Sequence, residues 1–217
     1  MSDSAVGDSE NLRLDHVLVG VADLEEGSER MGALTGVTPV FGGSHPKLGT
    51  HNALLGLGKD LYLELIAVRP KVDHAGQFEF LRGCSEPIPV GWVVATDDRR
   101  RTAARLVDSG FTPGEFLAGG RVRESGERLS WQMFAVEERL LGTSPFFIEW
   151  GDGTLHPSAD APQGCAVAEL SLVDPRAERL ERLIAALALE VEVAEGPSRI
   201  ELELETPAGR VGLGTVS

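Results

Sequence analysis

The sequence predicts an α+β fold made of repeated βαβββ units whose mixed sheets curve around a cleft. The first observation is a repeated phrase, because LDHVLVGVADL and VGWVVATDD each run from a β-rich stretch into a helical pattern. The second is the spacing, since 13 residues separate Asp23 from Gly36 and 13 separate Asp97 from Gly110. The third is the exit turn, GVTP after one helix and GFTP after the other. Two unrelated segments seldom agree in cap, helix length and exit turn.

Strand-like runs follow each predicted helix. The helices cover about 24–35 and 98–109, and alternating or continuous apolar residues after them are typical of strands. The two units therefore span 12–68 and 88–151 and form one domain over 12–158. They are expected to follow a polar, disordered lead-in at 1–11. The runs are VTPVF, HNALLGLG and LYLELIAV in the first unit, and FTPGEFL, RLSWQMFAV and SPFFIEWG in the second.

A third, degenerate copy is predicted over residues 166–215. AVAELSLVD ends in Asp174-Pro175, a typical helix start with proline at its first position. Strand-like runs at 189–194, 198–206 and 209–214 come after the helix, and the middle one alternates apolar residues with glutamates. Modules of this kind pair, so the odd one is expected either to pack on the first two or to pair across a homodimer. We favour the homodimer.

Composition excludes several classes of function. The chain has 20 Lys and Arg against 34 Asp and Glu, a net charge of −14, which is unsuited to binding nucleic acid. It has no apolar run long enough to span a membrane, and its opening residues do not form a secretory signal. Cys84 and Cys165 are too far apart in sequence for a zinc knuckle or a redox pair, so a cytoplasmic protein is expected. Serine-hydrolase, P-loop and dinucleotide-binding motifs are absent.

Two polar residues interrupt otherwise apolar strands. Alternation places His16 on one face with Leu14 and Leu18, and places Glu64 on one face with Tyr62 and Ile66. A histidine and a carboxylate at such positions must be paired, hydrogen-bonded or metal-bound, because an unpartnered buried charge is costly. A core histidine bonded to a backbone carbonyl, and a glutamate paired with an arginine, are the structural alternatives.

The phrases LDHVLVGVADL, HPKLGTHNALLGLG, LYLELIA and PFFIEWGDGTLHPS, in this order, resemble the glyoxalase-like branch of the vicinal oxygen chelate superfamily. The resemblance covers residues 12–158 and, more weakly, the third unit. It implies paired βαβββ modules around a cleft. It also implies an enzyme that binds a divalent metal through the first and last strands of each module, with a substrate that chelates the metal through adjacent oxygens.

The resemblance assigns metal ligands at three positions. His16 matches the first-strand ligand, while Glu64 and Glu149 match the last-strand ligands of the two modules. The fourth position departs from the pattern, because the repeat places Val90 there and the third copy offers Val167. One imidazole and two carboxylates can hold Mn²⁺, Mg²⁺, Fe²⁺ or Zn²⁺ with open positions for substrate. Glu149 alternatively faces solvent.

Further residues are candidates for contact with the substrate. His45 and His51 lie at the two ends of the loop HPKLGTH, and His156 lies in LHPS. Each of the three is expected near the mouth of the cleft. Tryptophans on module-two strands would form an aromatic wall for a planar ligand, with an adjacent glutamine as a polar contact; ordinary core packing is the alternative. The set is His45, His51, His156, Trp92, Trp131, Trp150 and Gln132.

Two functions from different classes remain open at this point. The first is a small-molecule enzyme whose metal acts as a Lewis acid, with Glu64 or Glu149 as general base, giving isomerase, lyase or epoxide-opening chemistry. The second is a metal-free protein that binds or sequesters small molecules, which the net charge and the missing ligand at Val90 favour. The metal content of the purified protein separates the two.

Overall fold

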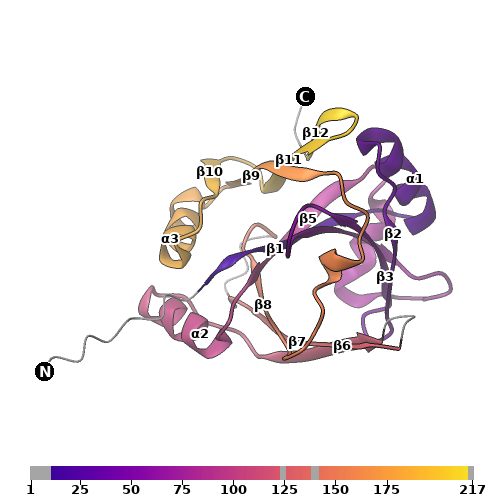
Figure 1. The fold of residues 1–217 in the computed structure, drawn as a ribbon. Helices are drawn as coiled ribbons and strands as arrows, with labels where there is room; N and C mark the ends of the chain where they lie inside the picture. The colour runs from indigo at the N-terminus through magenta and orange to yellow at the C-terminus, as the bar shows by residue number, and fades with distance from the viewer. Residues whose placement is uncertain (1–10, 123–125, 138–141, 215–217) are drawn as a thin grey trace, which may run out of the picture.

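The computed structural model describes residues 11–122, 126–137 and 142–214. Residues 1–10 of the predicted lead-in lie outside the described residues. The predicted α+β class with a curved sheet is confirmed: eight strands of the first two units form one mixed sheet, and four strands of the third unit form another (Figure 1). Within the described ranges, no helix is long and apolar enough to cross a membrane.

The first two units have the same topology. The first comprises β1 (Arg13–Gly20), α1 (Leu24–Thr35), β2 (Val40–His45), β3 (Thr50–Gly56) and β4 (Tyr62–Val68), followed by the 3₁₀ segment η1 (Gly76–Gly83). The second comprises β5 (Ile88–Ala95), α2 (Arg99–Asp108), β6 (Leu117–Val122), β7 (Arg128–Ala135) and β8 (Phe146–Trp150). The strand order is β2-β3-β4-β1-β5-β8-β7-β6, so the units meet edge to edge at the β1–β5 pair.

The helix starts differ by one residue between the units. The Asp23 side chain accepts hydrogen bonds from the backbone of Glu25 and Glu26 at 2.9 and 3.0 Å and so caps α1. The predicted equivalent in α2, Asp97, is not the cap. Asp98 accepts from the first turn of α2 instead, whereas Asp97 is exposed and lies 3.7 Å from Arg13. The repeat is therefore out of register by one residue at this point.

The sheet curves until its two ends approach each other (Figure 1). The guanidinium of Arg121 on β6 lies against Gly43 on β2, where a Cβ would be 2.7 Å from Nη1. The segment between β8 and β9 crosses the concave face and contains η2 (Pro157–Ala159). Ala161 packs there against Leu54 and Tyr62. The concave face is thus enclosed by this segment.

The third unit has the expected element order and a different strand order. It comprises β9 (Ala166–Asp174), α3 (Ala177–Leu187), β10 (Glu192–Glu195), β11 (Arg199–Thr206) and β12 (Gly209–Leu213). Its sheet runs β10-β9-β11-β12, so β9 pairs in parallel with β10, the strand directly after the helix. In the other units the first strand pairs in parallel with the last one.

The third unit packs on the outer face of the large sheet, on the side opposite the η2 segment (Figure 1). Its apolar side chains, such as Leu172 and Leu202, belong to the same buried cluster as Val17 and Trp92. A polar contact also joins the two parts, because the Thr143 hydroxyl donates to buried Asp174 at 2.7 Å. The third unit was expected either to pack on the first two units or to pair across a homodimer. Within one chain it packs on the first two units, and the homodimer stays a prediction.

Candidate functional site

A β-bulge at the start of β1 sets up the site. Leu14 pairs with Val94 and His16 pairs with Val93. These partners are two residues apart on β1 but adjacent on β5, so Asp15 is the extra residue of the bulge. A bulge breaks the strict alternation of side chains. The prediction that Leu14 shares a face with His16 is therefore wrong. Leu14 packs with the buried cluster that contains Val17, Trp92 and Leu172, here called the outer cluster. Asp15 turns to the concave face beside His16.

Asp15 is a fully buried carboxylate with three ring N–H partners. Its Oδ1 lies 2.6 Å from His16 Nδ1. Its Oδ2 accepts from Trp150 Nε1 at 2.8 Å and lies 3.2 Å from His156 Nε2. Burial alone would raise the pKa of Asp15, but hydrogen bonds to His156 and His16 and electrostatic interaction with these imidazoles hold that pKa well below its usual range. Asp15 is therefore an ionised anchor for the two imidazoles.

His16 lies between two carboxylates. With Nδ1 directed at ionised Asp15, the other ring nitrogen, Nε2, faces Glu64 Oε2 at 3.5 Å. The second oxygen of Glu64 accepts from Asn52 Nδ2 at 2.7 Å. All four residues are buried. The sequence prediction that His16 and Glu64 share one enclosed face agrees with this geometry.

Aromatic rings surround the imidazoles. Tyr62 stacks on His16 with ring centroids 4.6 Å apart, and His156 meets the edge of Tyr62 at 5.5 Å. Trp150 lies against His156, and Trp131 lies at 67° to Trp150 with centroids 5.6 Å apart. Two of the three predicted tryptophans thus share the concave face with the histidines. Burial raises the pKa of Tyr62 well above its ordinary value, so the phenol stays protonated.

His45 and Arg121 bring an imidazole and a guanidinium to the same face. His45 lies at the end of β2, where its Nδ1 is 3.1 Å from Thr50 Oγ1. Burial lowers the pKa of His45, the nearby charge of Glu64 opposes that shift, and the charge of Arg121 adds to it. Arg121 lies two positions from Gly119 on β6, over which the Trp131 indole packs. Its side chain therefore shares the face of Trp131.

Glu149 does not join His16 and Glu64. Its carboxylate accepts from the backbone N–H of Arg99 at 2.7 Å and pairs with the Arg99 guanidinium, so it caps the start of α2. On β8 the concave side belongs to Ile148 and Trp150, which pack with Trp131. Across the described ranges, no group of three or more His, Cys, Asp and Glu is placed to hold a metal ion. The structure thus leaves the predicted three-ligand set with two members.

Three other predicted contacts lie away from this face. Gln132 pairs in register with Glu149 and so faces the α2 side. His51 precedes the inward-facing Asn52 and points outward, near the charges of Asp23 and Arg69. Trp92 packs in the outer cluster, and its indole donates to the Thr143 carbonyl at 2.7 Å.

Sequence reasoning placed Tyr62 on the face of Glu64 without assigning it to the site, and it missed Asp15, Asn52 and Arg121. The pairing of β3 with β4 brings Asn52 next to Glu64. No sequence signal pointed to Asp15, since strict alternation places it on the face of the strand opposite to that of His16. Arg121 required knowledge that β6 closes onto β2.

Comparisons with known proteins give one family match and several similar solved structures. Residues 14–188 match the pattern of a family described as glyoxalase-like domain. A hypothetical protein from Staphylococcus aureus superposes with a TM-score of 0.69 at 13% identity, covering 95% of this chain and all of that one. Methylmalonyl-CoA epimerase from Mycobacterium tuberculosis gives a TM-score of 0.46 at 18% identity, covering 63% of this chain and 85% of that one. A hypothetical protein from Bacillus halodurans gives a TM-score of 0.47 at 12% identity, covering 67% of this chain and 97% of that one.

Among curated proteins, no sequence matches the chain significantly. The Staphylococcus likeness, at such low identity, concerns the fold alone, and it extends over the third unit because it covers nearly the whole chain. The family pattern reaches from β1 to the end of α3, well over half of the sequence. The chain belongs to the glyoxalase-like domain family, within the vicinal oxygen chelate superfamily.

Proposed function

We propose that this chain is an enzyme that moves a proton to and from a small carbonyl compound, with His16 and Glu64 as the acid–base pair. The observation that carries the proposal is the 3.5 Å approach of His16 Nε2 to Glu64 Oε2 beside the anchor Asp15. Asp15 accepts the proton on Nδ1, so Nε2 is the ring nitrogen of His16 that can exchange a proton with Glu64 or with a bound substrate. Such a pair can accept or release that proton, as general acid–base catalysis requires.

The surroundings of the pair suit a substrate that develops negative charge on oxygen. Removing a proton from a carbon next to a carbonyl places charge on the carbonyl oxygen, and a fixed cation or hydrogen-bond donor stabilises it. Arg121 supplies a cation on the same face. The phenol of Tyr62 supplies a proton that is not lost at neutral pH. Isomerisation or elimination next to a carbonyl is the reaction class that these groups support.

The divalent metal implied by the resemblance does not fit the donors present. His16 and Glu64 contribute two ligands, whereas protein sites for transition metals ordinarily use three or more. Arg99 holds the third predicted ligand, Glu149, at the start of α2. Val90, at the fourth position, belongs to the apolar surroundings of Ile66 and Leu81. The proposed proton transfer therefore includes no step at a metal.

A binding protein without chemistry is the second candidate. The observation that favours it is the edge-to-face pair of indoles, Trp131 and Trp150, next to the buried Asp15 and His16. Such a corner offers apolar area and one polar contact to a planar ligand. The two candidates differ in whether His16 and Glu64 exchange a proton with the bound molecule.

Hydrogen–deuterium exchange at carbon tests the proposal. The protein is incubated in D₂O with a panel of 2-oxo acids, 2-hydroxy ketones and acyl thioesters, and deuterium next to each carbonyl is followed by proton NMR. We expect exchange with at least one class. His16→Gln and Glu64→Gln should each slow it by about 100-fold or more. His74→Gln, an exposed histidine in the segment after β4, is the matched control and should leave the rate unchanged.

Two results would contradict acid–base catalysis by this pair. If no compound exchanges but some shift the indole resonances of Trp131 and Trp150, the chain is a binding protein. If elemental analysis of protein purified without chelator finds one divalent ion per chain, and chelation abolishes an exchange that Mn²⁺ or Zn²⁺ restores, the reaction depends on a metal centre.

A further inference from the structure

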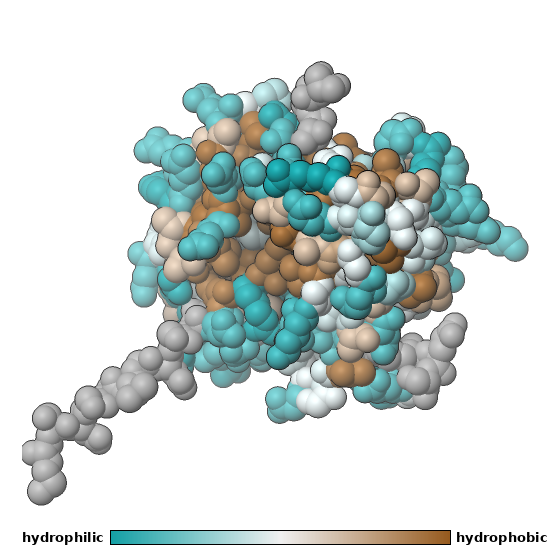
Figure 2. Space-filling view, turned by 45° about the horizontal axis from the view of Figure 1, so that its top comes forward, coloured by the Kyte–Doolittle hydropathy of each residue, from teal (hydrophilic) through white to brown (hydrophobic). Residues whose placement is uncertain are grey.

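A groove lies between the third unit and the large sheet, on the face opposite the His16–Glu64 pair. Its volume is about 660 Å³, within the size range of small-molecule sites. It is bounded by β1 and β5 on one side, and by β9 and the segment between α3 and β10 on the other. Figure 2 shows this side of the molecule, where hydrophobic side chains gather near the middle with hydrophilic ones around them.

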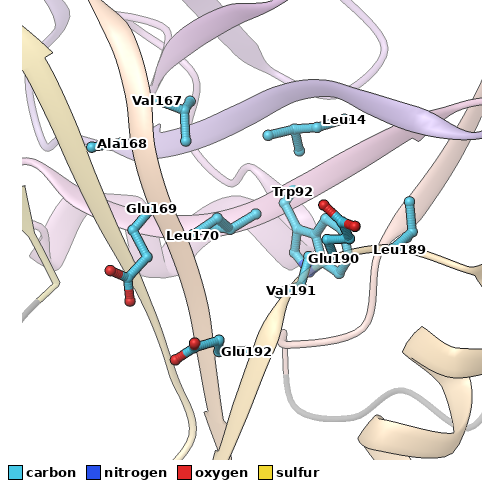
Figure 3. Close-up of a pocket in the computed structure, with 10 residues that line it drawn as sticks. All are labelled: Leu14, Trp92, Val167, Ala168, Glu169, Leu170, Leu189, Glu190, Val191 and Glu192. Atoms are coloured by element: carbon cyan, nitrogen blue, oxygen red, sulfur yellow. The ribbon is translucent and has the colours of Figure 1, made fainter.

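The floor and walls of the groove are apolar. Leu14 reaches it because the bulge at Asp15 turns Leu14 outward. Trp92 backs the inner wall of the groove as a fully buried ring, and its N–H is bonded to the Thr143 carbonyl. Figure 3 shows these side chains around a common space. The apolar lining is Leu14, Trp92, Val167, Leu170, Leu189 and Val191.

Three carboxylates complete the lining. Glu169, Glu190 and Glu192 are exposed, and Figure 3 places the carboxylates of Glu169 and Glu192 at the edge of the space. Within the described part of the chain, none of the three forms an ion pair. In the same unit Glu201 and Glu203 do pair, with Arg199 and Arg210. Among the described residues that line the groove, none is a lysine, arginine or histidine.

We propose that this groove binds a small amphipathic cation, a primary or quaternary amine that carries a hydrocarbon chain or ring. The hydrocarbon would cover the apolar walls, where burial of apolar area drives binding. The ammonium would lie at the rim near the three carboxylates. Charge complementarity argues for this occupant over the alternatives on the chain itself. Residues 1–10 carry three acidic groups and no Lys or Arg, and a second copy carries a net charge of −14.

Octylammonium is the probe, with octanoate as its matched anion, both used below their micelle-forming concentrations. In ¹H–¹⁵N NMR spectra, octylammonium should shift the indole resonance of Trp92 and leave those of Trp131 and Trp150 in place, because only Trp92 lines the groove. Octanoate should bind at least tenfold more weakly. Affinity for octylammonium should fall with added salt, since the carboxylates are exposed.

Substitutions separate the groove from general charge effects. The variant Glu190→Gln/Glu192→Gln should weaken octylammonium binding about 3- to 10-fold at low salt. The control Glu181→Gln/Glu195→Gln makes the same charge change at exposed positions of the third unit outside the groove, and should bind like the unmodified protein. Val191→Arg places a cation in the groove and should abolish binding while the far-ultraviolet circular dichroism stays unchanged.

Several results would overturn the proposal. Equal binding of octanoate and octylammonium would remove the role of the carboxylates. Shifts at Trp131 and Trp150 in place of Trp92 would put the ligand on the concave face. Failure of octylammonium to bind, together with binding of a lysine-rich peptide, would assign the groove to a protein partner. A dimer in solution that Val191→Arg converts to a monomer would assign it to a second copy.

Discussion

Replacing Asp15 by asparagine tests whether this carboxylate anchors the site. Asparagine keeps the shape, removes the charge and turns one acceptor oxygen into a donor. Three hydrogen bonds from ring N–H groups then lose their charged acceptor. Hydrogen bonds to a charged partner contribute about 1 kcal/mol more than neutral ones, so the total loss is about 3 kcal/mol. Asp15→Asn should therefore lower the free energy of unfolding by about 3 kcal/mol at pH 7.

The pH dependence of this loss has a definite sign. The pKa of folded Asp15 is lowered, so its stabilisation is complete above the unfolded pKa of about 4 and declines as the pH falls below it. In the unfolded chain the carboxyl takes up a proton near pH 4, while in the folded protein it remains ionised. The difference between the unmodified protein and Asp15→Asn should shrink by up to about 1.4 kcal/mol per pH unit below pH 4.

Urea unfolding followed by tryptophan fluorescence, at pH 7 and at pH 3, measures both quantities. Asp152→Asn is the matched control, because Asp152 is an exposed carboxylate in the segment that leads to His156. Its effect should stay within about 0.5 kcal/mol at both pH values. A loss below 1 kcal/mol for Asp15→Asn at pH 7, or a loss that grows in acid, would refute the view of Asp15 as an ionised anchor.

Two further substitutions concern contacts that hold the architecture. Glu149→Gln should lower the free energy of unfolding by about 1 kcal/mol, because it weakens the cap and ion pair at Arg99. It should leave the activity proposed for His16 and Glu64 intact. A loss of activity like that of Glu64→Gln would place Glu149 in the site. Asp174→Asn should cost about 1–3 kcal/mol, because buried Asp174 accepts hydrogen bonds from Thr143 and Ser198. Hydrogen exchange should then accelerate in β9–β12 before β1–β8, and uniform acceleration would show that the third unit does not open separately.

The repeated units were predictable because their signals are local. The Asp23 cap, the Gly36 stop and the apolar period of each strand all act within a few residues. The order of strands in the third unit was not predictable in this way. β9 carries the same alternation whether its parallel neighbour is β10 or β12, so the pattern of its residues does not specify the neighbour.

In the candidate site too, some positions followed from local sequence patterns and others did not. Alternation in β4 placed Glu64 with Tyr62 and Ile66, and the structure agrees because β4 pairs regularly with β3. The same reasoning did not transfer to Glu149. On β8 the residues on either side of Glu149, Ile148 and Trp150, face the concave side, so Glu149 faces away from it and pairs with Arg99. Alignment of the repeats therefore matched two glutamates that point to opposite sides of the sheet.

The sequence by itself determined the α+β class, the two βαβββ units and the burial of His16 and Glu64, since each depends on short-range patterns of apolar and capping residues. Only the tertiary structure decided that Asp15 joins His16 while Leu14 turns away, because that depends on a bulge in the pairing of β1 with β5. It also decided that Trp150 and His156 meet at Asp15, since residues so distant in sequence come together only when the sheet curves and the segment after β8 crosses its concave face. Periodicity specifies which residues are buried, whereas curvature and register specify which buried residues meet.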